Sequence, residues 1–459
     1  MDLVIRNATV VTAERQQVAD LGIAGGRIAQ IGGAMTGRRE IEARGLHALR
    51  GGVDPHVHLT NELPSPPNEE LTWVDDFTSG SEAALAGGIT TVGNMTFAAT
   101  GATMPEAVAA ARAMIERQAM VDVLLHPVLA PFYPGASEDL ARLDGEGHRS
   151  LKLFMSLADF DRHFDGYRQA VRAAAAQGTI VLIHCEDASV IHQCTTALLA
   201  RGCGLQHFAE SRPPVAEVSA IRRAIALAEE TGATMYIVHL SCGEALAACE
   251  EARARGVPIH VEVRPIYLHL TEECYRSANA GLFVGQPPLR RQSDVDALWA
   301  GIRRGAVHTV GSDHAPFTAA QKLDPRHTLL DLRPGVAELD TMLPLLFTVG
   351  MRDKDVPLER LVALTATNPA RIFGLYPRKG TIAVGSDADL TLWDLDLPRT
   401  IDGTRMRSRA GYSPYEGMTA SAWPRLTIRR GEVVFEEGEI RARVGSGRLL
   451  ARGPTLPPA

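Results

Sequence analysis

The chain has 459 residues, of which 45% are hydrophobic, and its formal net charge is -7. A chain of this length exceeds what one hydrophobic core normally serves, so we expect one large domain and a smaller companion. The acidic balance and the lack of a long Lys/Arg block argue against a nucleic-acid partner and favour a small-molecule partner. The first residues lack a signal-peptide pattern, and no apolar run reaches the length of a membrane span. We therefore expect a cytoplasmic protein without a membrane partner.

Six cysteines are scattered along the chain without a CxxC pair. In a reducing compartment this pattern predicts free thiols and no disulfide framework. The six are Cys185, Cys194, Cys203, Cys242, Cys249 and Cys274.

Both ends of the chain have the pattern of short strands separated by glycine turns. Residues 1–50 contain LVIRNATVV and DLGIAGGRIAQIGG, and the pattern returns in GTIAVGSDADLTLWD and PRLTIRRGEVVFEEGE. Two β-rich ends around a different middle predict one small β domain built from residues 1–50 and 379–440. Residues 441–459, rich in Gly, Pro and Arg, are expected to form an extended C-terminal tail that packs on a neighbouring subunit.

Between these ends, residues 51–378 alternate short apolar runs with segments of helical period. The helical segments close on or near glycines that can act as C-caps, as in FDGYRQAVRAAAAQG. Eight such strand–helix units predict an α/β fold, a (β/α)8 TIM barrel. The eight apolar runs are GGVDPHVHL, GITTVGNM, VDVLLHPVL, SLKLFMS, TIVLIHC, TMYIVHLS, PIHVEVRP and HTVGSDH.

Potential metal ligands stand at the ends of five predicted strands. Reactive residues of a barrel belong at the carboxyl ends of its strands, and side chains two apart on a strand point to the same side. A lone buried histidine is more often a hydrogen-bonded core residue, but four histidines and an aspartate recurring at strand ends favour a metal site. Imidazole and carboxylate without cysteine suit zinc and related divalent ions. The candidate ligands are His56, His58, Lys152, His184, His239 and Asp313.

Lys152 and Asp313 each allow more than one interpretation. A lysine inside an apolar run is costly to bury while charged, so Lys152 either reaches an exposed strand end or is carboxylated by CO2 to an anionic carbamate. A carbamate has two oxygens that can bridge two cations. Asp313 can be a metal ligand, a general base or both, and the alternative is an aspartate that stabilises a turn.

Several motifs resemble the cyclic amidohydrolases of the amidohydrolase superfamily, which include dihydropyrimidinases, hydantoinases, allantoinases and dihydroorotases. The resemblance covers nearly the whole chain, and its last two segments look most like the hydantoinase and dihydropyrimidinase branch. The motifs are DPHVH, GGITTV, the Lys152 strand, HCED, ESRPPVAE, VHLSC, GSDHAP, TNPARIFGLYPRKGTIAVGSDADLTLWD and YSPYEGM.

The resemblance implies two divalent metal ions, with zinc the expected metal. His56, His58 and Asp313 would bind the more buried ion, His184 and His239 the other, and carboxylated Lys152 would bridge them. It also implies a composite β-sandwich from the two ends and a homo-oligomer, a tetramer or a dimer.

The implied chemistry is hydrolytic opening of a cyclic amide or imide to a carbamoyl-amino acid. A hydroxide bridging two ions is available near neutral pH, and one ion can polarise the carbonyl. Asp313 would act as the general acid/base, taking the proton of the attacking water and delivering it to the departing nitrogen.

The substrate pocket departs from the family pattern at several positions. Thr60 stands where dihydroorotases usually have an arginine that grips a carboxylate, which disfavours a carboxylated pyrimidine. Leu157 replaces a tyrosine that many D-hydantoinases and dihydropyrimidinases carry. Gln286 stands where these enzymes tend to have a serine, and Arg333 or Pro334 where an asparagine often contacts the ring. These departures leave open a hydantoin of other stereochemistry, allantoin or another cyclic ureide.

Two further classes of function remain as alternatives. Some dihydropyrimidinase-like proteins are non-catalytic assembly proteins that have lost metal ligands, whereas this chain keeps all six ligand types. A single-metal deacetylase-like amidohydrolase shares the barrel and the His-x-His strand, but Lys152 and the hydantoinase-like C-terminal segment disfavour it. The sequence therefore favours an enzyme that hydrolyses a cyclic amide.

Overall fold

The computed structural model describes residues 1–59 and 73–459. Within these residues eight parallel strands form two sheets, β6–β7–β8 and β9 to β13 in sequence order. Parallel bridges from Val128 to Lys152 and from Val57 to His314 join the two sheets into a closed ring. The predicted (β/α)8 barrel is thereby confirmed, and each of the eight predicted runs overlaps a barrel strand. The strands are β6 (Gly52–Val57), β7 (Ile89–Thr96), β8 (Asp122–Pro127), β9 (Ser150–Phe154), β10 (Ile180–His184), β11 (Met235–Ile237), β12 (Ile259–Val263) and β13 (Thr309–Val310).

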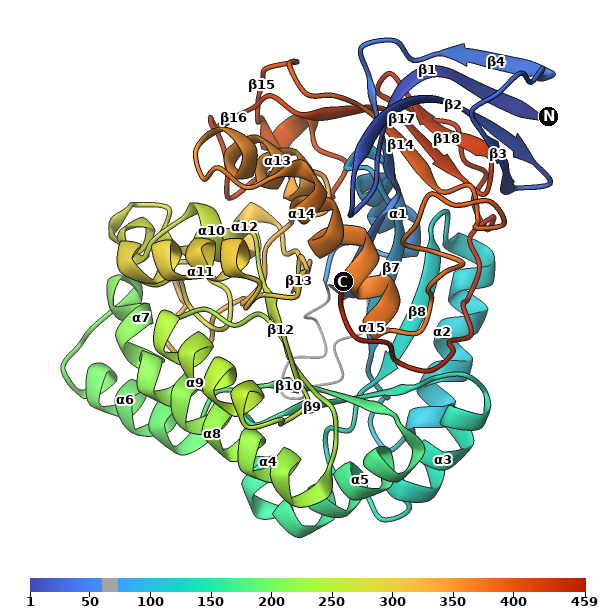
Figure 1. Cartoon of the computed structure of the whole chain (residues 1–459). Coiled ribbons are helices and arrows are strands. Elements are labelled where there is room, and N and C mark those ends of the chain that lie inside the picture. Colours follow the sequence, from blue (N-terminus) through green and yellow to red (C-terminus); the bar gives the residue numbers. More distant parts are fainter. Residues whose placement is uncertain (60–72) are drawn as a thin grey trace.

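The barrel strands are almost continuously apolar because helices cover them on the outside. Every residue of β10, with sequence IVLIH, is buried, as expected for a parallel strand with both faces covered. Figure 1 shows the helices surrounding these strands. They are α1 (Phe77–Ala86), α2 (Met104–Gln118), α3 (Ala136–Gly145), α4 (Ala158–Arg162), α5 (Phe164–Gln177), α6 (Ala188–Ala200), α7 (Phe208–Ser211), α8 (Pro214–Thr231), α9 (Gly243–Ala254), α10 (Ile266–His269), α11 (Gln292–Arg304), α12 (Ala319–Lys322), α13 (Met342–Arg352), α14 (Leu358–Val362) and α15 (Asn368–Ile372).

Local signals set where these helices begin and end. The Asp76 side chain accepts from the backbone of Thr78 and Ser79 and so caps the first turn of α1. Gly178, with φ of 69°, ends α5 in the left-handed conformation that glycine adopts without a steric penalty. The predicted glycine C-caps are thus found in the structure.

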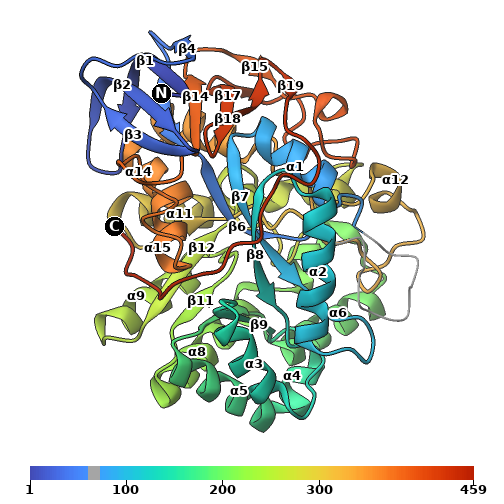
Figure 2. The same ribbon diagram turned by 90° about the vertical axis from the view of Figure 1, so that its right-hand side faces the viewer.

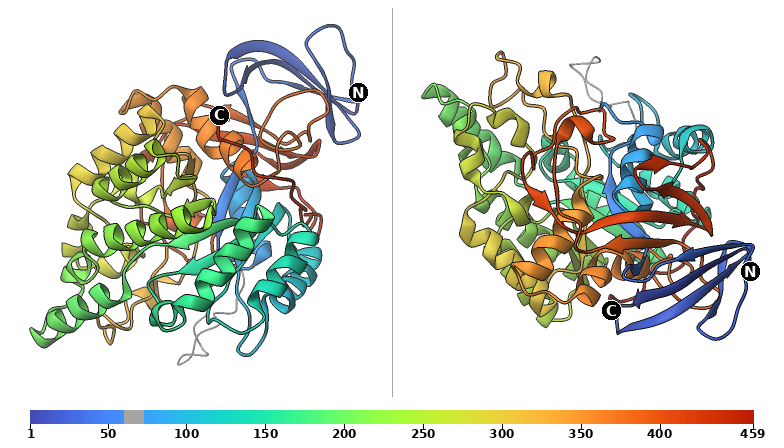
Figure 3. Two further views of the ribbon diagram at one scale, coloured as in Figure 1. Left: turned by 60° about the horizontal axis from the view of Figure 1, so that its bottom comes forward. Right: turned by 90° about the horizontal axis from the view of Figure 1, so that it is seen from above.

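A single sheet joins the two ends of the chain, as the strand pattern predicted. Its order is β19–β18–β17–β14–β5–β1–β2–β3, and β4 pairs with β1. Figure 1 shows the blue N-terminal and red C-terminal strands together beside the barrel, and Figure 3 shows the same sheet from two other sides. The precise limits 1–50, 379–440 and 441–459 stay a prediction. The strands are β1 (Leu3–Val11), β2 (Gln16–Ala24), β3 (Arg27–Ile31), β4 (Arg39–Glu42), β5 (His47–Arg50), β14 (Leu390–Asp394), β17 (Trp423–Arg429), β18 (Glu432–Glu436) and β19 (Glu439–Ile440); a separate hairpin holds β15 (Arg399–Thr400) and β16 (Thr419–Ala420).

The C-terminal tail packs on its own barrel. Leu449 bridges Val123 in β8, and the backbone N–H of Leu450 donates to the carbonyl of Val123 at 2.8 Å. Further along, the buried Arg452 guanidinium donates to the Leu125 carbonyl and the Ser150 hydroxyl. Figure 2 shows the dark red tail crossing the barrel toward α15. These contacts lie within the chain, and the expected contact of the tail with a neighbouring subunit stays a prediction.

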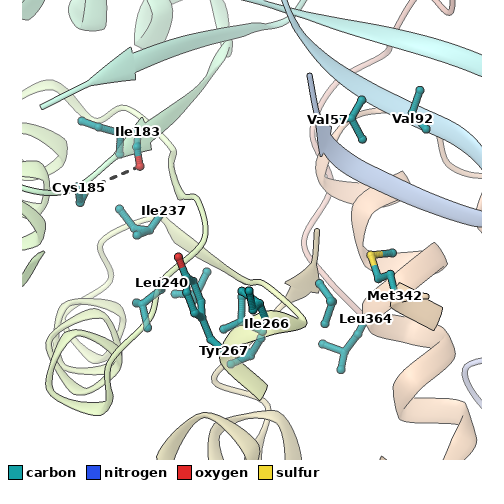
Figure 4. Packing of buried hydrophobic residues seen from close by; sticks show 14 of the residues in the cluster. Val57, Val92, Ile183, Cys185, Ile237, Leu240, Ile266, Tyr267, Met342 and Leu364 are labelled. Atoms are coloured by element: carbon teal, nitrogen blue, oxygen red, sulfur yellow. Dashed lines mark hydrogen bonds between the residues drawn. The ribbon is translucent and has the colours of Figure 1, made fainter. Parts of the chain in front are cut away.

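The main hydrophobic core lies between the barrel strands and the helices around them. Figure 4 shows part of it, with Val57 and Val92 from two neighbouring strands and Met342 from a covering helix. All six cysteines are free thiols, as predicted. Among the described helices, none combines the length and apolar composition that a membrane crossing needs.

Candidate active site

A cavity of about 270 Å³ opens at the carboxyl ends of the barrel strands, and all six predicted ligands line it. This is the end where barrel enzymes carry their reactive groups. The ligands come from residues 56–58, 152, 184, 239 and 313, so five separate strands or strand ends contribute. The structure therefore brings together side chains that lie up to 257 positions apart in sequence, from His56 to Asp313.

The first group of ligand atoms consists of two imidazole nitrogens around one carboxylate oxygen. Asp313 Oδ1 lies 3.1 Å from His56 Nε2 and 3.0 Å from His58 Nε2. Glu262 Oε1, 2.9 Å from His56 Nδ1, fixes the orientation of that ring from behind. The three side chains form a compact group with the ligand types that a divalent ion accepts.

The second group is a pair of histidines at the ends of neighbouring strands. His184 Nδ1 and His239 Nε2 are 3.0 Å apart, close to the roughly 3.3 Å between two nitrogens on one tetrahedral zinc ion. Glu186 Oε2, 2.7 Å from His184 Nε2, holds the outer nitrogen of that ring, and Arg212 pairs with the same carboxylate. Each imidazole in the pair thus directs one nitrogen toward its neighbour.

Asp313 and His239 hold strained backbone conformations. Their φ angles are 47° and 38°, in the left-handed region that residues with a Cβ rarely adopt. Such positions persist where the surrounding structure enforces them, and they concentrate at functional sites.

Lys152 is fully buried in the cavity wall. Its ammonium lies 4.8 Å from the centre of the Phe154 ring and has no hydrogen-bond partner among the described residues. Burial lowers the pKa of Lys152 to about 8, although Asp313 and Glu262 oppose that shift. An unpartnered buried ammonium is unfavourable, so this environment disfavours the charged form of Lys152.

The charges around Asp313 keep its carboxylate ionised. Burial would raise the pKa of Asp313, but Arg264 and His56 outweigh burial and hold that pKa well below its usual range. Burial lowers the pKa of His58 to about 4 despite its contact with Asp313, so this imidazole is neutral at pH 7. A carboxylate and a neutral imidazole are the protonation states that bind a metal ion.

The predicted substrate contacts fall in different places. Leu157, Gln286 and Pro334 line the cavity. Arg333 is not among the described residues that line it, because its guanidinium bonds to the Asp331 carbonyl in its own loop. Thr60 lies outside the described residues.

One wall of the cavity is apolar. Trp73 packs on the ring of His58 with 4.6 Å between centroids, and Phe97 stacks on Phe154 at 5.8 Å. Leu157 completes this wall and is 45% exposed, so it stands at the open side of the cavity. The cavity therefore has candidate ligand atoms on one side and an apolar surface on another, a combination typical of small-molecule sites.

The model of the amidohydrolase family matches residues 48–434. The chain belongs to this family. It is 34% identical to a D-phenylhydantoinase of Escherichia coli O9:H4 (strain HS), with all of both chains covered, and 34% identical to a D-hydantoinase of Ralstonia pickettii, covering 98% of this chain and 99% of that one. The crystal structure of a dihydropyrimidinase from Brevibacillus agri NCHU1002 covers all of both chains with a TM-score of 0.94 and 32% identity. The resemblance inferred from the motifs is thus confirmed.

Three buried charged residues that contact the candidate ligands of this amidohydrolase were not predicted. Glu186, Glu262 and Arg264 are fully buried, and each contacts a candidate ligand. The sequence contained one signal, because a glutamate and an arginine within the apolar run PIHVEVRP need buried partners. Which partners they have depends on contacts between distant strands, and strand pattern alone does not give these.

Proposed function

We propose that the protein is a metal-dependent hydrolase that opens the C–N bond of a cyclic amide or imide, such as a hydantoin or dihydropyrimidine ring, to give a carbamoyl-amino acid. The observation that carries this proposal is the single cavity lined by four imidazoles, Lys152 and Asp313 beside an apolar wall. The names of the similar proteins support the substrate class.

The donor set fits two divalent ions, and we propose zinc. His56, His58 and Asp313 would hold one ion, and His184 and His239 the other, because the ligand atoms converge in these two groups. Carboxylated Lys152 would bridge the two ions. Its buried nitrogen, without a partner in the described part of the chain, supports this modification.

When bound, the two ions would supply an activated water and a Lewis acid for the scissile carbonyl. Asp313 accepts the proton from the attacking water and passes it to the departing ring nitrogen, which a carboxylate at the edge of the cavity can do. Glu262 and Glu186 keep the rings of His56 and His184 in their ligating orientation. The apolar wall excludes water from the side of the substrate that does not react.

The substrate contacts remain part of this proposal. Gln286 lines the cavity and can hydrogen-bond a ring that carries adjacent N–H and carbonyl groups. This favours, as a second candidate, allantoin or another cyclic ureide. Leu157 gives an apolar contact where a hydroxyl was expected from related enzymes. Thr60, outside the described residues, stays a predicted contact, and we assign Arg333 no contact.

We also propose that the protein works in the cytoplasm as a homo-oligomer. The free thiols support a reducing compartment. The oligomeric state rests on the family resemblance, and sedimentation of the purified protein tests it.

A panel of rings tests the function: dihydrouracil, hydantoin, both enantiomers of a 5-substituted hydantoin, allantoin and dihydroorotate. We expect protein of measured metal content to open at least one ring, and a chelator to abolish this activity until zinc is restored. Lys152→Ala should lose activity and metal, whereas the control Lys354→Ala, which changes a lysine paired with Asp296, should keep both. Labelling with ¹³C-bicarbonate should give a carbamate carbon signal that Lys152→Ala lacks. Fully loaded protein that opens none of these rings would contradict the proposed substrate class.

A further inference from the structure

The late segment YSPYEGM connects to the active site through buried side chains. Tyr415 in this segment is fully buried, and its hydroxyl donates to Glu338 Oε1. The other oxygen of Glu338 accepts from Arg264 Nη2 at 2.9 Å. The segment therefore extends, through Glu338, to a fully buried arginine next to the metal ligands.

Arg264 reaches Asp313 from behind the cavity. Its Nη1 lies 3.0 Å from Asp313 Oδ2, and its Nε donates to the Ser312 carbonyl at 3.1 Å. Arg264 has no exposed side-chain surface and is not among the described residues that line the cavity. It is therefore placed to act on the carboxylate and not on a substrate.

The two oxygens of Asp313 are held by different groups. Oδ1 faces the nitrogens of His56 and His58, whereas Oδ2 faces Arg264. These different contacts at the two oxygens oppose rotation of the carboxylate about the Cβ–Cγ bond, which the left-handed backbone at this position does not restrain by itself.

We propose that Arg264 is a positioning residue that locks Asp313 with Oδ1 toward the metal site, and that Glu338 and Tyr415 hold Arg264 in place. The pairing explains why a buried arginine is tolerated here, since its charge lies between two carboxylates. The shape of the guanidinium matters, because Nη1 forms an ion pair with Asp313 while Nη2 and Nε donate hydrogen bonds to Glu338. The inference relies on the proposed function only in taking Asp313 as a metal ligand.

The test compares Arg264→Met and Arg264→Lys with Arg429→Met. Arg429 is also fully buried, but it donates to the Met120 carbonyl and the Ser446 hydroxyl, away from the cavity. Zinc affinity is measured by competition with a chromophoric chelator, kcat and KM are measured on the ring that the wild type opens, and folding is checked by thermal melting. Two further variants, Glu338→Gln and Tyr415→Phe, test the outer part of the connection.

We expect Arg264→Met to weaken zinc binding and lower kcat by about 10- to 100-fold, the usual effect of losing a residue that orients a ligand. KM should stay close to the wild-type value, because Arg264 does not line the cavity. Arg264→Lys keeps the charge but loses the fork, and Glu338→Gln and Tyr415→Phe loosen Arg264, so these three variants should show smaller losses. Arg429→Met should change thermal stability alone.

A purely structural role gives a different result. If Arg264→Met lowers the melting temperature while zinc affinity and kcat stay at wild-type values in the folded protein, the inference is wrong. If Arg264→Met does not fold, the zinc affinity and kcat of Arg264→Lys and Glu338→Gln test the inference in its place. Zinc affinity reports on Asp313 even if the wild type opens none of the rings, so failure of the proposed substrate class and failure of this inference are distinguishable.

Discussion

The two ends of the barrel each contain a pair of packed histidine rings, but the pairs have different surroundings. At the carboxyl end, His184 and His239 lie 4.6 Å apart and direct nitrogens toward each other across 3.0 Å beside a cavity. At the amino end, His260 and His308 lie 5.4 Å apart, and His308 Nδ1 accepts the backbone N–H of Val261. Ring packing alone therefore does not indicate a metal site. The direction of the nitrogens and a neighbouring cavity do.

Asp313→Asn gives the largest expected contrast between the ends. This change keeps the shape of the side chain but removes the charge and the proton acceptor, so kcat should fall by about 10²- to 10⁴-fold. His308→Gln, at the amino end, should leave kcat unchanged in the folded protein. Steady-state kinetics on metal-loaded protein measures both. Equal losses in the two variants would mean that the ends do not differ in function.

The pH dependence of stability sharpens the contrast at the amino end. Burial lowers the pKa of His260 to about 4, below its value of about 6.5 in the unfolded chain. As the pH falls, His260 therefore binds a proton in the unfolded state at a higher pH than in the folded state. Its contribution to the free energy of unfolding is complete above pH 6.5 and is lost as the pH falls toward 4. The loss amounts to at most about 3 kcal/mol. Denaturant unfolding of wild type and His260→Gln from pH 7 to 4 measures it, and the variant should show the shallower decline; parallel curves would assign the dependence to other groups.

Arg452→Met tests how the tail contributes to the amino-end half of the barrel. The change removes the hydrogen bonds to the Leu125 carbonyl and the Ser150 hydroxyl, and should lower the free energy of unfolding by about 2 kcal/mol. Because these contacts lie away from the cavity, kcat and KM should stay constant. Urea denaturation with parallel kinetics gives both values, and a selective loss of kcat would mean that the tail supports the site.

Leu157→Ala should have the smallest effect, confined to substrate preference. Shortening this side chain removes part of the apolar wall, so kcat/KM for a 5-phenyl-substituted ring should fall about tenfold relative to the unsubstituted ring. Competition between the two rings in one reaction measures the ratio. If the ratio is unchanged, the substituent lies elsewhere in the cavity.

Much of the fold and the core of the candidate site follow from the sequence because they depend on local patterns. Eight apolar runs with intervening helical segments indicate the barrel, and the rule that reactive groups stand at carboxyl ends selects His56, Lys152 and Asp313. Each apolar run and each strand-end residue can be recognised from a few neighbouring residues, without knowing which distant segments it contacts.

The remaining features depend on contacts between distant segments. The salt bridge from Arg264 to Asp313 joins residues that follow the neighbouring strands β12 and β13, and Glu338 reaches Arg264 from 74 positions along the chain. The tail position likewise depends on its pairing with β8. Neither hydrophobic period nor charge pattern determines which buried groups meet, so these contacts required the structure.

The pairing of β5 with β14 has a consequence for how the protein is made. In this pair Arg50 lies opposite Leu390, 340 positions later in the chain. Strands β1 to β5 therefore emerge from the ribosome long before β14 is synthesised. While the barrel is being translated, the β5 edge of the nascent sheet has no partner strand. An unpaired strand edge can pair with strands of other chains. A message truncated anywhere between β5 and β14 should consequently yield an aggregating product, however much of the barrel it encodes.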